Sequence, residues 1–206
     1  MQHDAMLVYL SIKGFAKPEA LAFALDAETA AVERALAALE AAEHAERTKI
    51  GWRLRESGKA AAAQALADER ARVAPGEMAA AYERFTVLNE RFKSIVTAWQ
   101  IRRIGDSDVP NDHTDAAYDA GIVSDIQAVD AEIAQLLGWL AERIPRTAPY
   151  RRRFARALEN AQRGESRFVA APLIDSYHTV WFELHEDLIR LSGTTREAEA
   201  AAGRGA

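Results

Sequence analysis

The sequence contains no cysteine, and its 206 residues include only 6 prolines and 11 glycines. Without cysteine the chain has no disulfide framework and no thiolate metal site, as is common in a reducing compartment. No uninterrupted apolar run approaches the ~20 residues that a membrane-spanning helix needs. Residues 1–11 lack a basic start and a small-residue cleavage site, so we expect no secretory signal. These absences predict a cytoplasmic protein with no membrane partner.

Several catalytic motifs are absent as well. The chain has no Gly-x-Ser-x-Gly motif and no glycine-rich phosphate loop. We therefore predict that it is not an enzyme and that it carries no cofactor. The net charge is −5, and neither half of the chain is basic. This disfavours tight electrostatic binding to nucleic acid, because phosphate contacts supply most non-specific affinity, but a local basic patch stays open.

Residues 4–72 have the pattern helix, helix, helix, β-hairpin, helix. Helices are expected at 4–10, 18–25 and 28–42, and the third has an apolar stripe at four- and three-residue spacing. After Gly51 the pattern alternates, with Trp52 and Leu54 on one side of a strand and Arg53 on the other. Ser57 is a candidate N-cap for a helix that reaches residue 71.

The segment VERALAALEAAEHAERTKIGWRLRESGKAAAAQAL (32–66) resembles the recognition helix, wing and following helix of MarR-like regulators. The resemblance implies a winged helix-turn-helix domain over 1–74 that binds double-stranded DNA. Helix 28–42 would then enter the major groove, and the hairpin would reach the minor groove or the backbone. The candidate DNA contacts are Thr29, Arg34, Arg47, Lys49, Arg53 and Arg55.

The same helix departs from a typical DNA-reading surface. Glu28 and Glu33 would face an anionic partner unfavourably, and Glu43-His44 stands where such families usually have a glycine. A winged helix used for dimerisation or for docking to another protein is therefore an alternative.

The second half is predicted to be an antiparallel helical bundle over 75–195, which would dimerise the chain. Helices are expected at 77–104, from about 112 to 143, around Tyr150–Leu158 and at 174–191, with a loop at 105–112. The basic run Arg151-Arg152-Arg153 and Arg156 is interpreted as a solvated face. Residues 196–206 are expected to form a disordered tail.

Two histidines stand in the stretch DSYHTVWFELH (175–185). Heptad spacing makes Tyr177, Trp181 and Leu184 a core seam, with His178 and His185 at its border. Seven residues separate the histidines by about 10.5 Å along a helix. Because zinc–nitrogen distances are about 2.1 Å, one metal cannot easily bind both, and no metal site is predicted.

A second polar stretch, PNDHTDAAYD (110–119), admits three interpretations. In the first, Asp112 is the N-cap of a helix and Asp115 lies in its first turn, where the exposed N–H groups and the helix dipole favour both carboxylates. Alternatively, this stretch forms a polar ligand pocket with residues of the neighbouring helices, or a metal site. The ligand-binding candidates are Trp99, His113, Asp115, Asp119, His178 and His185.

The strings NDHTDAAYD, ARALENAQRGES and DSYHTVWFELHEDLI resemble the C-terminal helical region of MarR-type bacterial regulators, some of them linked to phosphoenolpyruvate-utilising dikinases. The combined expectation is a homodimeric, DNA-binding transcriptional regulator whose bundle senses a small anionic effector. A first alternative is an interaction module that regulates a phosphoenolpyruvate-utilising enzyme without binding DNA. A second is a metal- or ligand-dependent bundle enzyme.

Overall fold

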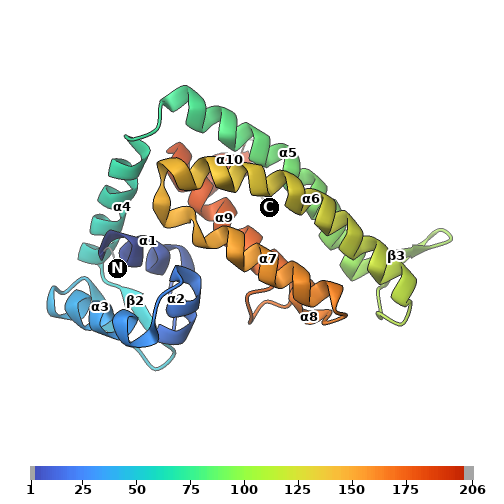
Figure 1. The fold of residues 1–206 in the computed structure, drawn as a ribbon, viewed down its shortest axis with the longest axis horizontal. Helices are drawn as coiled ribbons and strands as arrows, with labels where there is room; N and C mark the ends of the chain where they lie inside the picture. The colour runs from blue at the N-terminus through green and yellow to red at the C-terminus, as the bar shows by residue number, and fades with distance from the viewer. Residues whose placement is uncertain (1–2, 202–206) are drawn as a thin grey trace.

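The computed structural model describes residues 3–201, and the fold is mainly helical (Figure 1). The first part contains helices α1 (His3–Lys13), α2 (Pro18–Leu25) and α3 (Thr29–Ala41), then a hairpin and helix α4 (Glu56–Arg70). The hairpin consists of β1 (Ala45–Arg47) and β2 (Trp52–Leu54). The element order predicted for 4–72 is therefore present.

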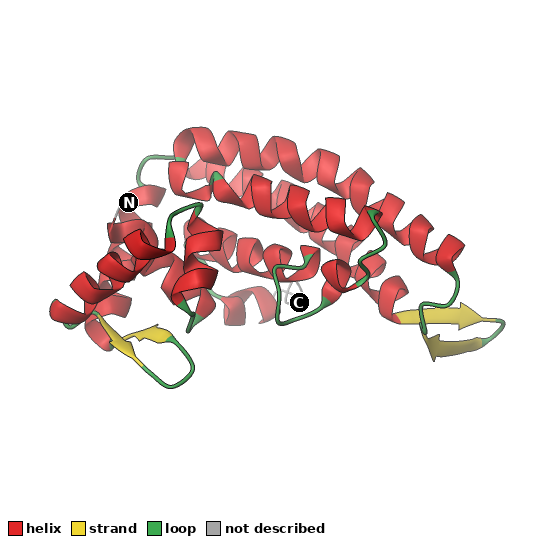
Figure 2. Ribbon diagram, turned by 60° about the horizontal axis from the view of Figure 1, so that its bottom comes forward, coloured by secondary structure: helices red, strands yellow, loops and turns green. Residues whose placement is uncertain are grey.

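The second part begins with α5 (Pro75–Gln100), a hairpin of β3 (Ile101–Ile104) and β4 (Ser107–Pro110), and α6 (Ala116–Arg143). It continues with the 3₁₀ turn η1 (Pro145–Thr147) and the helices α7 (Pro149–Gln162), α8 (Arg167–Ala170), α9 (Tyr177–Ser192) and α10 (Arg196–Ala201). Helices α5, α6, α7 and α9 pack around a shared core, each against two of the others. The two hairpins lie at opposite ends of the molecule (Figure 2).

The first hairpin is joined to the linker between α1 and α2. Ala45, Glu46 and Arg47 pair with Leu54, Arg53 and Trp52, and Trp52 also exchanges two backbone hydrogen bonds with Ala16, at 2.8 and 2.9 Å. A Cβ atom at Gly51 would lie 2.7 Å from the Ala16 carbonyl oxygen, so this approach requires glycine. Residues 45–54 are thereby held against the helices of the first part.

The helix predicted over 77–104 ends four residues early, at Gln100. Half of the loop expected at 105–112 forms strand β4. The apolar seam of α5 stops at Trp99, while Ile101 and Ile104 are exposed. Gly105, with φ 62°, and Asp106 form the two-residue turn of a hairpin. The Gly105-Asp106 dipeptide is the sequence feature that indicates the second hairpin.

Three helix starts also differ from the expectation. The N-cap of α6 is Asp115, whose carboxylate accepts from the Tyr118 N–H, whereas Asp112 accepts from Thr114. Helix α9 starts at Tyr177 with Ser176 as its N-cap, three residues later than expected. Ser57 caps no helix, because its hydroxyl donates to the Glu43 carbonyl.

The end of the chain differs from the predicted disordered tail. Residues 196–201 form α10, and the buried carboxylate of Glu199 accepts a hydrogen bond of 2.6 Å from the Tyr82 hydroxyl. The remainder of the predicted tail, 202–206, lies outside the described residues. Among the residues that are described, we find no helix with both the length and the apolar character to cross a membrane.

One apolar core runs through both parts of the molecule, across the helix break at residues 71–74. A buried ion-pair cluster lies at their junction. The Arg146 guanidinium donates to both carboxylate oxygens of Glu69 on α4, at 2.9–3.1 Å, and to both of Asp187 on α9, at 2.7 and 2.9 Å. This bidentate pairing on two sides attaches α4 to the bundle.

In the basic run, Arg151, Arg152 and Arg156 are exposed, but Arg153 is not part of a solvated face. The Arg153 side chain is fully buried and donates to Asp175 at 2.6 and 2.9 Å and to Glu183 at 2.7 Å. Lys13 of α1 forms a further ion pair with Glu183. The prediction is wrong for Arg153 because Asp175 and Glu183 are distant in sequence and meet it only in the folded chain.

We expect Arg146→Met to lower the free energy of unfolding by ~3–5 kcal/mol, because it leaves two carboxylates buried without their partner. Urea titration followed by circular dichroism measures this loss. Arg91→Met is the matched control, since Arg91 pairs with Glu132 on the exposed surface and should contribute less than ~1 kcal/mol. Equal losses in the two variants would contradict the central role of Arg146.

Candidate functional site

The exposed face of α3 is short of positive charge. Arg34 is exposed, but Glu33 and Glu40 share the same solvent-facing surface, and Glu28 and Glu43 flank the helix. The remaining exposed positions of this helix are alanines. Thr29, the first residue of α3, is half-buried. This helix therefore offers one cation and mostly small side chains to a partner.

The first hairpin is the more basic surface. Arg47 and Lys49 are exposed near its tip and form no ion pair with any described residue. Arg53 and Arg55 share the carboxylate of Glu46, at 2.6 and 3.4 Å, while remaining 60% and 46% exposed. Of the six predicted DNA contacts, Arg34, Arg47 and Lys49 are the cations that form no ion pair with any described residue.

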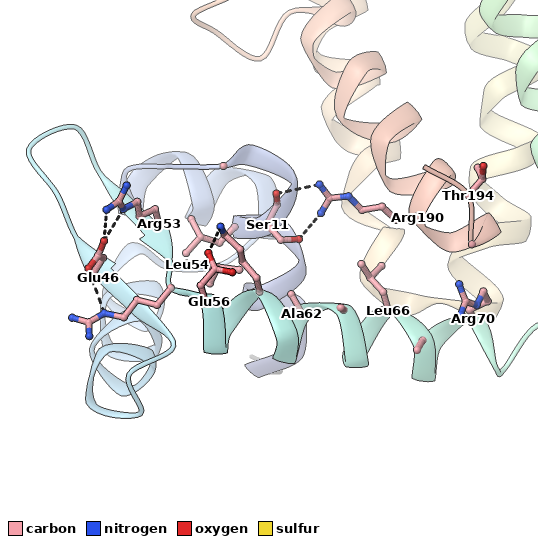
Figure 3. A pocket seen from close by; sticks show the side chains of 17 residues that line it. Ser11, Glu46, Arg53, Leu54, Glu56, Ala62, Leu66, Arg70, Arg190 and Thr194 are labelled. Atoms are coloured by element: carbon pink, nitrogen blue, oxygen red, sulfur yellow. Dashed lines mark hydrogen bonds and ion pairs between the residues drawn. The ribbon is translucent and has the colours of Figure 1, made fainter. Parts of the chain in front are cut away.

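A groove of about 1030 Å³ lies between the first hairpin, α4 and the C-terminal end of α9 (Figure 3). Its floor includes Leu54, Ala62 and Leu66, and its sides carry Arg53, Arg55, Lys59, Arg70 and Arg190 together with Glu46 and Glu56. Arg190 is itself held by Ser11, at 2.8 Å, and by Glu186, at 2.7 Å.

The local sequence pattern does not indicate this groove. Arg70 and Arg190 are 120 positions apart in the chain, and no motif connects them. The Arg70 guanidinium packs directly on Gly193, where a Cβ atom would lie 2.7 Å from Nη1. The left-handed conformation of Gly193, φ 78°, ends α9 at this point. The positive φ favours glycine at this helix end, and the missing Cβ leaves room for the Arg70 guanidinium.

Three of the six ligand-binding candidates meet at the other end of the molecule. The imidazole of His113 lies 4.3 Å from the Trp99 ring, centroid to centroid, and its Nδ1 is 2.9 Å from the Asp119 carboxylate. The buried amide of Asn111 joins them, donating to the Trp99 carbonyl at 3.1 Å and to Asp119 at 2.9 Å. Asn111, which completes this cluster, was not predicted.

Trp99, His113 and Asp119 line a cleft of about 470 Å³ beside the N-terminal half of α6 and the end of α7. Polar groups come from Ser124, Gln127, Gln162 and Ser166, and apolar contacts come from Ala116, Ala120, Val123 and Ala161. The cleft is large enough for a small molecule and combines apolar walls with convergent polar groups.

The other candidates lie elsewhere, so the six do not form one site. Asp115 faces Arg102 of the second hairpin at 2.9 Å. His178 packs near Phe92, 6.1 Å between ring centroids, and His185 is buried against Phe85, at 5.0 Å. Both histidines lie on the side of α9 that packs on α5, away from Asp119. Within residues 3–201, no group of three or more histidine or carboxylate side chains is arranged to hold a metal ion.

Comparison of the chain with protein-family models, with curated proteins and with solved structures finds no match. The surface of the first hairpin and the cleft around Trp99 and His113 are therefore interpreted from their geometry alone.

We expect His185 to make the protein less stable in mild acid. Burial lowers the pKa of His185 to about 4, whereas an unfolded histidine titrates near 6.5. Between these values the unfolded chain binds more protons, so the stability from neutral His185 is complete above about pH 6.5 and is lost as the pH falls toward 4. His185→Gln should reduce this loss in urea titrations at pH 7 and pH 5. Parallel stability curves for wild type and variant would contradict this role.

Proposed function

We propose that the chain is a DNA-binding transcriptional regulator in which residues 1–74 act as a winged helix-turn-helix module. The order of its elements and the pairing of Ala16 with Trp52 support this proposal. The observation that carries it is the pair Arg47 and Lys49, exposed and without ion pairs near the tip of the hairpin that follows α3. Such cations are suited to phosphate contacts.

The charge distribution defines how this module would bind. With glutamates on its exposed face, α3 can neutralise few phosphates, so the hairpin supplies most of the affinity and Arg34 is the one basic contact from the helix. In this proposal the chain acts as a homodimer, whose two modules contact half-sites about one helical turn apart. The resulting binding is salt-sensitive and involves few contacts per protomer.

A second candidate function is protein recognition through the same module, and the acidic face of α3 favours it. Glu33 and Glu40 repel a phosphate backbone but complement a basic surface on another protein. The expected partner would be a metabolic enzyme whose activity the chain regulates without DNA. The two candidates differ in the sign of the charge that their partner presents to α3.

A salt titration tests the DNA-binding proposal. Three unpaired cations per protomer, at ~0.9 per phosphate contact, predict that log K falls against log salt with a slope of roughly −3 per protomer. Fluorescence anisotropy with DNA from upstream of its own gene measures the slope and the stoichiometry.

The double variant Arg47→Ala/Lys49→Ala should reduce the slope by about 2 units per protomer. Arg91→Ala, remote from the hairpin on α5, is the matched control. Absence of binding at low salt would contradict the proposal.

Charge reversal on α3 separates the two candidates. If α3 approaches DNA, Glu33→Lys replaces repulsion by attraction and should tighten DNA binding severalfold at low salt. If α3 instead recognises a basic protein surface, the substitution leaves DNA binding at its weak baseline. Glu142→Lys, on the bundle helix α6, controls for the change in net charge. Equal gains from both substitutions would show a purely non-specific effect.

A further inference from the structure

The cleft beside Trp99 and His113 has an unusual balance of charges and hydrogen-bonding groups. Its lining residues include the carboxylate of Asp119 but no lysine or arginine. Arg102 of the second hairpin is paired with Asp115, and neither residue lines the cleft. The cleft therefore lacks a permanent positive charge with which to hold the anionic effector expected from the sequence.

The hydrogen bonds of Asn111 determine which nitrogen of His113 carries the proton. The Asn111 amide has two protons, and they point to the Trp99 carbonyl and to Asp119 Oδ1. Since Asp119 Oδ2 lies 2.9 Å from His113 Nδ1 and cannot donate as a carboxylate, Nδ1 must be the donor of that bond. In the neutral imidazole, Nε2 is then a free acceptor with no hydrogen-bond partner among the described residues.

The backbone holds this imidazole in an uncommon conformation. His113 has φ 58°, in the left-handed region, where histidine is one of the few side chains other than glycine that occur repeatedly. The Asn111 side chain stabilises it by accepting from the His113 N–H at 3.3 Å. A cap for α6 does not need this arrangement, because Asp115 already caps the helix. The conformation places the ring against Trp99, where both residues line the cleft.

We propose that this cleft binds a small protonated amine with an apolar body. The ammonium group would donate to the Asp119 carboxylate, whose charge a neutral His113 does not compensate. The Trp99 ring adds the attraction of an aromatic face for a cation. Ala116, Ala120 and Val123 would contact the apolar body. This inference concerns the bundle alone and does not depend on whether the first hairpin binds DNA.

Matched ligands test the inferred chemistry. We would titrate the full chain with 2-phenylethylamine, with its neutral analogue 2-phenylethanol and with the anion 3-phenylpropanoate. Two-dimensional NMR of the tryptophan indole N–H groups gives a site-specific signal, with Trp99 assigned by Trp99→Phe. We expect the amine to shift the Trp99 signal saturably and to leave Trp52 of the first hairpin unchanged. The alcohol should bind at least about tenfold more weakly, because it lacks the charge-assisted hydrogen bond, and the anion should not bind.

Two substitutions locate the binding. Asp119→Asn removes the negative charge and should weaken amine binding at least about tenfold. Ala120→Phe fills the cleft from an exposed helical position without changing any charge, and it should block binding even if Asp119→Asn disturbs folding. Asp115→Asn is the matched control, since Asp115 pairs with Arg102 and does not line the cleft.

Three outcomes would overturn the inference. The first is no saturable Trp99 shift with the amine at millimolar concentration. The second is binding of the anion as tight as that of the amine, and the third is unchanged amine binding by a folded Ala120→Phe variant.

Discussion

The guanidinium of Arg146 is the interaction on which the arrangement of the two parts depends. It is almost fully buried and joins Glu69 of α4 to Asp187 of α9, while the Tyr150 hydroxyl donates to the same Asp187 carboxylate at 3.1 Å. Burying these charges costs desolvation energy, and the cost is offset only while every partner is present. This arginine in the turn after α6 therefore attaches α4 to the bundle, together with the shared apolar core and the ion pair of Lys13 with Glu183.

The two candidate sites follow from this arrangement. The first hairpin lies at the start of α4, and the groove beside it extends along α4 to the end of α9. The cleft around Trp99 and His113 lies next to the second hairpin, at the far end of the bundle (Figure 1). Helix α6 joins the two regions, because its N-terminal half lines the cleft and Arg146 follows its C-terminal end. One surface is suited to an anionic partner and the other to a cation.

Much of the fold was predictable from local signals. Pro18 indicated the start of α2, and apolar spacing located α3 and the core seams of α5, α6 and α9. The errors occurred where two local signals competed. Asp112 and Asp115 are both good N-caps, and only Asp115 has the hydrogen bond to Tyr118. The sequence predicts a helix through Ile104 and then a loop, but the exposed isoleucines and the Gly105 turn favour a hairpin.

The sequence by itself determined the helical class, the order of elements in 4–72 and the shortage of positive charge on α3, because periodicity and composition act over a few residues. It also identified Trp99, His113 and Asp119 as candidates. Only the tertiary structure decided which candidates meet. It left His178 and His185 outside the cleft and joined Asn111 to Trp99 and Asp119 by hydrogen bonds. It likewise buried Arg153 and placed Arg146 between two carboxylates. The physical reason is that pairing between charges distant in sequence depends on how helices pack, and no local pattern records it.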